Sequence, residues 1–140
     1  MWAKPLFLLP VILMAVADVS SDAKQDVSRL QGTWKVVAMV KNGDRASKEE
    51  VSNGKLVVEG KSLTLFGLNE KQPTKYGFRL DVAKTPKTLD VLHPSLPPVL
   101  GIYELQGDTL KICFRPLGED RPTEFKAEAG SGSTLFTLKR

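Results

Sequence analysis

Apolar and polar residues alternate over short stretches along most of this chain, and the stretches are separated by Gly, Pro, Asn or Asp. Alternation with a period of two, broken at such turn residues, is typical of antiparallel strands that bury one face. Nine segments show the pattern, at residues 33–40, 55–59, 62–66, 75–80, 88–92, 99–105, 109–115, 122–128 and 133–140. The pattern therefore predicts an all-β domain of eight or nine short strands.

Two tight turns fix the register of two hairpins within this pattern. The turn at Gly60-Lys61 places Val58 opposite Leu63 and Leu56 opposite Leu65. For the turn at Gly107-Asp108, pairing outward gives the apolar face Leu105–Leu110, Tyr103–Ile112 and Gly101–Phe114, and the opposite face Glu104–Lys111 and Ile102–Cys113. An apolar face backed by a charge-paired face indicates a sheet wrapped around a core.

Helical signals are confined to the start of the chain and to one short turn. Residues 18–32 predict a helical lead-in, because Ala23, Val27 and Leu30 share one face and Gly32 is a natural stop. Residues 47–51 predict a single further turn. The stretch 93–98 contains three prolines and is a loop, since proline donates no hydrogen bond to a strand ladder.

Residues 1–17 have the features of a secretory signal peptide. A lysine at position 4 precedes the apolar run 5–17, which ends in the small-x-small sequence Ala15-Val16-Ala17. A membrane anchor or a buried helix is the alternative, but a membrane span needs about 20 apolar residues. We expect cleavage between Ala17 and Asp18, and a secreted or periplasmic product with no stable membrane anchor.

The remaining residues, 18–140, are enough for one domain with one core. The whole chain has a formal charge of +4, and loss of Lys4 would leave a small positive balance spread along the sequence. Such a balance predicts no nucleic-acid partner. We expect a monomer.

The sequence Gly32-Thr33-Trp34 opens the first predicted strand and resembles the Gly-x-Trp motif of lipocalins. Eight strands suit a closed up-and-down barrel, although a two-sheet sandwich uses similar strands, and this motif favours the barrel. In lipocalins the Trp closes one end of the barrel and a basic residue of the last strand packs over its indole. Alternation along 133–140 places Arg140, rather than Lys139, on the inner face. Gly32, Trp34 and Arg140 are therefore predicted to be the structural, barrel-closing residues.

More narrowly, the chain from residue 30 to its end resembles a bacterial domain family of unknown function, known chiefly from planctomycetes and described as lipocalin-like. The resemblance is carried by the stretches 30–37, 101–105, 107–114, 121–125 and 138–140. It implies a lipocalin-like fold and an exported setting. It implies no catalytic residue, because the family has no established activity.

Few residues suited to metal or covalent chemistry are present. The chain has one histidine, His93, and one cysteine, Cys113, whereas a zinc or copper site needs three or four such ligands. No metal site and no cofactor is expected, and His93 is interpreted as a solvated loop residue. Cys113 is interpreted as a buried structural thiol on the outer face, covered by the lead-in helix. With no visible catalytic constellation, we expect a protein that is not an enzyme.

Six residues are candidates for binding a ligand. Tyr76, Phe78 and Tyr103 could line a cavity, although aromatic residues at strand spacing more often fill a core. Arg115, Arg121 and Glu124 belong to a charged cluster that could recognise a carboxylate or phosphate at the barrel mouth. The alternative for the cluster is an ion-pair network within the loop that holds one strand against the next, which we favour.

The sequence thus predicts an exported, non-enzymatic module that binds a small apolar or amphipathic ligand. The alternative is a structural or protein-interaction domain of the cell envelope, with another envelope protein as its partner and a solidly packed barrel. A cavity with an open mouth favours the first hypothesis, and a filled interior favours the second.

Overall fold

The structure is a computed structural model that describes residues 22–68 and 72–140. The predicted signal peptide and its cleavage site lie outside the described residues. Within the described part of the chain, no helix has the length and apolar character that crossing a membrane requires.

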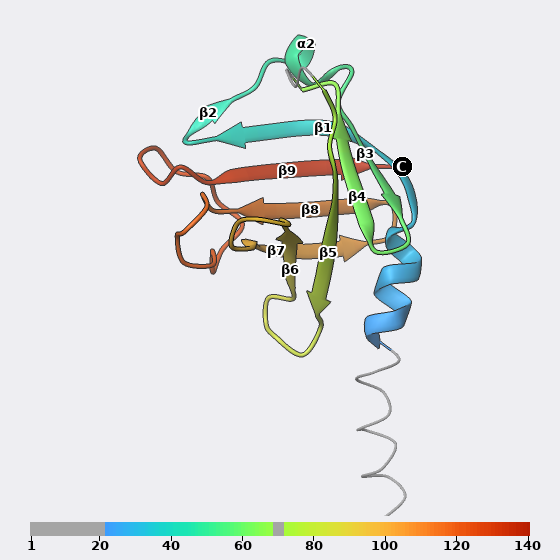
Figure 1. The fold of residues 1–140 in the computed structure, drawn as a ribbon. Helices are drawn as coiled ribbons and strands as arrows, with labels where there is room; N and C mark the ends of the chain where they lie inside the picture. Colours follow the sequence, from blue (N-terminus) through green and yellow to red (C-terminus); the bar gives the residue numbers. More distant parts are fainter. Residues whose placement is uncertain (1–21, 69–71) are drawn as a thin grey trace, which may run out of the picture.

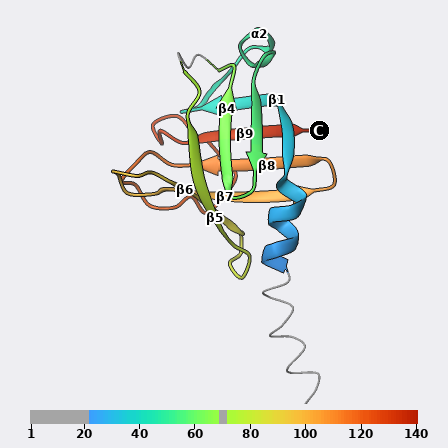
Figure 2. The ribbon, with the colours of Figure 1, turned by 45° about the vertical axis from the view of Figure 1, so that its right-hand side comes forward.

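One antiparallel sheet closes on itself to form the domain (Figures 1 and 2). Its strands are β1 (Gly32–Lys41), β2 (Asp44–Arg45), β3 (Lys55–Glu59), β4 (Ser62–Phe66), β5 (Lys75–Asp81), β6 (Thr88–Leu92), β7 (Val99–Gln106), β8 (Thr109–Phe114) and β9 (Thr134–Lys139). Consecutive strands from β3 to β9 pair in order, and β1 pairs with both β3 and β9. The predicted up-and-down barrel of eight strands is therefore confirmed, with β2 as a short extra strand beside the end of β1.

The two hairpin registers predicted from the turns are confirmed residue by residue. Val58 lies opposite Leu63 in the first, and Tyr103 opposite Ile112 in the second. Both helical predictions also hold within the described residues, since a helix covers 22–30 and a single turn, α2 (Lys48–Val51), follows a capping box made by Ser47 and Glu50.

A β-bulge in β1 reverses which side chains of the strand point into the barrel. The pairing of β1 with β9 shifts between Val36 and Ala38, and Val37 is left 42% exposed. Trp34 and Val36 lie inside before the bulge, whereas after it Met39 and the exposed Lys41 line the open cavity. Strict alternation from Trp34 would have turned Val40 inward instead.

The prediction of a strand over 122–128 is wrong. β8 and β9 pair directly with each other, so the sheet offers no edge for an intervening strand, and Pro122 has no N–H to donate. The 115–133 segment instead packs on the outside of the barrel, where Pro122 and Ala127 are buried.

This segment also corrects the prediction of what covers Cys113. The Cys113 Sγ lies 3.4 Å from the Lys126 carbonyl oxygen, to which it donates, so the 115–133 segment and not the N-terminal helix covers the thiol. The thiol is fully buried as predicted, and burial raises its pKa. Cys113 therefore stays a protonated, structural side chain.

Trp34 closes one end of the barrel together with the helix over 22–30. Its side chain is fully buried, and its Nε1 donates to the Leu30 carbonyl oxygen at 2.9 Å. The Arg140 guanidinium lies 4.2 Å from the centre of the indole ring and donates to the Gln31 carbonyl oxygen at 2.8 Å. Gly32, with φ of +112°, gives the backbone a conformation at the helix-to-strand corner that other residues rarely adopt.

A buried carboxylate fastens the helix to the same end. Asp26 is 3% exposed at its side chain, and it accepts from the Tyr103 hydroxyl at 2.6 Å and from the Lys87 ammonium at 2.9 Å. Burial first, and then the hydrogen bond and charge of Asp26, raise the pKa of the Tyr103 phenol well above its usual range. Tyr103 therefore acts as a neutral donor to a buried anion.

Replacing Tyr103 by phenylalanine is expected to lower the free energy of unfolding by about 1–2 kcal/mol at pH 7, because Asp26 stays buried with one partner fewer. The wild type should also lose stability as the pH rises above about 10, where the tyrosine of the unfolded chain ionises before that of the folded chain. The variant should lack that part of the alkaline loss. Urea unfolding at pH 7 and at alkaline pH measures both effects. Tyr76→Phe is the matched control, and equal losses in the two variants would contradict this role for Tyr103.

Candidate functional site

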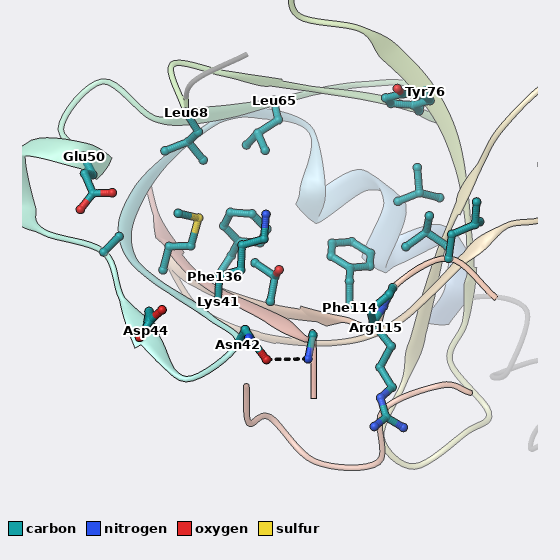
Figure 3. A pocket seen from close by; sticks show the side chains of 18 of the residues that line it. Lys41, Asn42, Asp44, Glu50, Leu65, Leu68, Tyr76, Phe114, Arg115 and Phe136 are labelled. Atoms are coloured by element: carbon teal, nitrogen blue, oxygen red, sulfur yellow. Dashed lines mark hydrogen bonds between the residues drawn. The ribbon is translucent and has the colours of Figure 1, made fainter. Parts of the chain in front are cut away.

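The end of the barrel opposite Trp34 is open and contains a cavity of about 1110 Å³ (Figure 3). It lies at the ends of β1, β4 and β8, where Lys41, Leu65 and Phe114 line it. The first residues of β7 and β9, Val99 and Thr134, line it as well. Its apolar wall is formed by Met39, Leu65, Leu68, Tyr76, Val91, Phe114 and Phe136. The volume is ample for a small-molecule site.

The cavity adjoins a second, smaller space of about 290 Å³, the inner chamber. The chamber shares five residues with the mouth: Leu65, Tyr76, Val91, Phe114 and Phe136. It reaches inward to Leu56, Leu63 and Ile112, and its polar lining residues are Gln72, Thr74 and Tyr76. Gln72 and Thr74 are exposed, so the inner chamber has a polar edge at the surface and an apolar wall inside the barrel.

Strand pairing explains how the Phe114 ring fits between the mouth cavity and the inner chamber. Gly101 lies directly opposite it in the β7–β8 ladder. A Cβ atom at position 101 would lie 2.6 Å from the Cδ1 atom of the Phe114 ring, closer than real Cβ contacts allow. Because Gly101 has no side chain, the Phe114 ring can pack directly against the backbone of β7.

Charged and polar residues surround the mouth. They are Lys41, Asn42, Asp44, Arg45, Glu50, His93 and Arg115. Asn42 joins the rim to the 115–133 segment, because its Oδ1 accepts from the Gly130 and Gly132 amides at 2.8 and 2.9 Å. His93 lies in the loop after β6, as predicted, and is half-buried at the mouth with its ring 5.5 Å from that of Tyr76. The rim is therefore polar above an apolar wall.

Of the six candidate binding residues, the structure brings only Tyr76 and Arg115 to the mouth cavity. Phe78 and Tyr103 are buried core residues that line neither the mouth nor the inner chamber. Tyr103 instead contacts Asp26 at the closed end. Most of the apolar wall was not predicted as a site, although the inner faces of the last strands already indicated Phe114 and Phe136.

Arg121 and Glu124 do not lie at the mouth, so the hypothesis of an anion site there that includes them is wrong. Arg121 and Arg79 both donate to the Asp90 carboxylate on the outer face of β6, Arg121 Nη2 at 3.2 Å and Arg79 Nε at 3.0 Å. Arg121 Nη1 also donates to the Gly101 carbonyl oxygen at 2.9 Å. Glu124 pairs with Lys126 in solvent at 3.6 Å.

Of the predicted charged cluster, Arg121 alone joins this network, and its partners Asp90 and Arg79 were not predicted. The network holds the 115–133 segment against the barrel. The Asp90 side chain is only 5% exposed. Burial alone would raise the pKa of Asp90, but the hydrogen bonds and charges of Arg121 and Arg79 outweigh it and hold the pKa below its usual value. The carboxylate is thus a fixed structural anion.

Within the described residues, no group of three or more His, Cys, Asp or Glu side chains is arranged to hold a metal ion. Comparison of the chain with known protein families, with curated proteins and with solved structures found no match. The fold stands on the strand pairing itself, and a closed eight-strand antiparallel barrel is consistent with the lipocalin-like fold that Gly32-Thr33-Trp34 predicts.

Proposed function

We propose that this protein is an exported, non-enzymatic module that binds a small apolar or amphipathic ligand in the mouth of its barrel. The observation that carries the proposal is the apolar cavity opposite the Trp34 end. Burying a ligand there removes apolar surface of both partners from water, at about 25 cal/mol per Å². We also propose that the chain belongs to the bacterial lipocalin-like family that it resembles, on the motifs within residues 30–140 that carry the resemblance.

The export part of the proposal rests on residues 1–17, whose charge, apolar run and small-x-small end are those of a signal peptide. The non-enzymatic part is supported by how the acidic groups are used. Asp26 and Asp90 are held by cationic side chains, and the Glu50 carboxylate accepts from the Ser47 amide at the start of α2. These carboxylates serve the fold.

The alternative, a structural or protein-interaction domain with a solidly packed barrel, is less well supported. Half-buried residues around the mouth, among them Met39, Leu65 and Phe136, leave space between them instead of filling the interior. Packing a barrel to the density of a protein core would remove that space.

Filling the chamber should abolish ligand binding. Val91 lines both spaces from β6, so Val91→Trp places an indole where the ligand is proposed to lie. We expect wild-type protein to bind the neutral apolar dye N-phenyl-1-naphthylamine with a rise in dye fluorescence, and the variant to lose at least about tenfold in affinity. Fluorescence titration measures both.

The matched control is Val37→Trp, which adds the same side chain at the exposed bulge of β1. It should bind the dye as the wild type does. Urea unfolding of both variants verifies that they are folded. The proposal fails if the wild type binds no dye, or if the two variants bind it equally well.

A further inference from the structure

Lys41 is an exposed, charged residue whose side chain lies over the apolar wall of the cavity. Figure 3 shows its ammonium end beside the ring of Phe136, directed into the cavity. The bulge at Val36/Ala38 is what turns this side chain inward, since the alternation before it would have pointed Lys41 to solvent. The bulge thus re-aims a single lysine into a ligand-sized space, which indicates a role for its charge in that space.

Three of the other charges at the rim, Arg115, Asp44 and Glu50, are placed differently. Arg115 and Asp44 extend away from the centre of the cavity in Figure 3. The Glu50 carboxylate accepts from the Ser47 amide, and those hydrogen bonds lower its pKa and commit it to the start of α2. Within the described residues, Lys41 has no carboxylate within the 4.0 Å of an ion pair. Asp44 lies opposite Lys41 in the β1–β2 pair and makes no ion pair with it. The Lys41 ammonium can therefore bind an anionic ligand.

We propose that the ligand is an amphipathic anion with a single alkyl chain, whose acidic head group binds Lys41 and whose tail enters the inner chamber. This inference rests on the proposed function and adds the chemical class of the ligand. The apolar chamber bounded by Leu56, Leu63 and Ile112 suits the tail. A carboxylate, sulfate or phosphate head group offers the same acidic oxygens to the ammonium.

The tail and the head group of such a ligand would each lie in an environment that suits them. The tail leaves water for a space walled by aliphatic and aromatic side chains. The head stays at the half-open mouth, where it keeps part of its hydration and gains a charge-assisted hydrogen bond. Removing the ammonium while keeping the length of the side chain should therefore affect acidic ligands and leave neutral ones alone.

The test compares three ligands that share one tail and differ in the head: dodecanoate, dodecanol and dodecylamine. Each displaces N-phenyl-1-naphthylamine from the full chain below the concentration at which micelles form. We expect the wild type to prefer dodecanoate, and Lys41→Met to weaken dodecanoate at least about tenfold while dodecanol is unchanged. Lys41→Arg should restore dodecanoate binding, and Lys41→Glu should shift the preference to dodecylamine.

Lys35→Met is the matched control, since Lys35 lies on the same strand before the bulge and is exposed on the outer face. It should leave all three affinities unchanged. The proposal that the ligand has an acidic head group fails if dodecanol and dodecanoate bind the wild type equally well. It also fails if Lys41→Met and Lys35→Met have the same affinities, and in both cases the proposed binding function is unaffected. If neither the dye nor any of the three ligands binds, the proposed function itself fails, and this inference with it.

Discussion

Replacing Trp34 by alanine is expected to lower the free energy of unfolding by about 3–5 kcal/mol, more than any other substitution proposed for this chain. The side chain is fully buried at the closed end, so its removal leaves a cavity that the strands around it cannot fill. It also removes the hydrogen bond to Leu30 and the surface on which Arg140 rests. Equilibrium unfolding in urea, followed by circular dichroism, measures the change.

The matched control is Val37→Ala on the same strand, where the side chain is 42% exposed at the bulge. It should change stability by no more than about 0.5 kcal/mol. If Trp34→Ala folds, it should still bind N-phenyl-1-naphthylamine, because Trp34 lines neither space of the open end. A variant that kept its stability and lost the dye would show that Trp34 serves the ligand rather than the fold.

The second large effect is expected at Asp90. Asp90→Asn should cost about 2–3 kcal/mol at pH 7, since it leaves Arg121 and Arg79 beside a neutral amide and loosens the 115–133 segment. The loss is limited because Arg121 and Arg79 are 31% and 60% exposed and regain water. Glu124→Gln is the control, because its ion pair with Lys126 is exposed and worth no more than about 1 kcal/mol.

The same residue sets an acid dependence. Because the pKa of Asp90 is lower in the folded protein than the value of about 3.9 in an unfolded chain, its contribution is complete above that pH. It is lost as the pH falls through the folded value. Asp90→Asn should therefore be destabilised at pH 7 and should show a smaller further loss below pH 4 than the wild type. If the free energy of unfolding fell by the same amount below pH 4 in both proteins, this would contradict the role given to Asp90.

Strand count, register and barrel closure could be predicted because local signals and long-range packing agree. The turns at Gly60 and Gly107 determine which residues face each other, and Gly32-Thr33-Trp34 identifies the closed end. The inner faces of β8 and β9 follow from the same alternation. These features depend on residues close in sequence, or on a pattern that only one facing can bury.

The site was harder to predict because it depends on where alternation fails. The bulge in β1 moves Lys41 to the inner face, and no turn residue or composition change marks it in the sequence. The segment over 122–128 alternates like a strand, but β8 and β9 pair directly with each other and leave no room for a strand between them. Phe78 and Tyr103 are buried in the core as aromatic residues at strand spacing usually are, and they line neither the mouth nor the inner chamber.

The central claim is that ligand enters at the end of the barrel opposite Trp34. Two reporters separate the ends, since Met39 is the single methionine and Trp34 the single tryptophan of residues 18–140. Dodecanoate can be titrated into a chain that begins at Asp18 while NMR follows the Met39 methyl and the Trp34 indole N–H. We expect a saturable shift at Met39 and little change at Trp34. A saturable shift at Trp34 with Met39 unmoved would contradict the account.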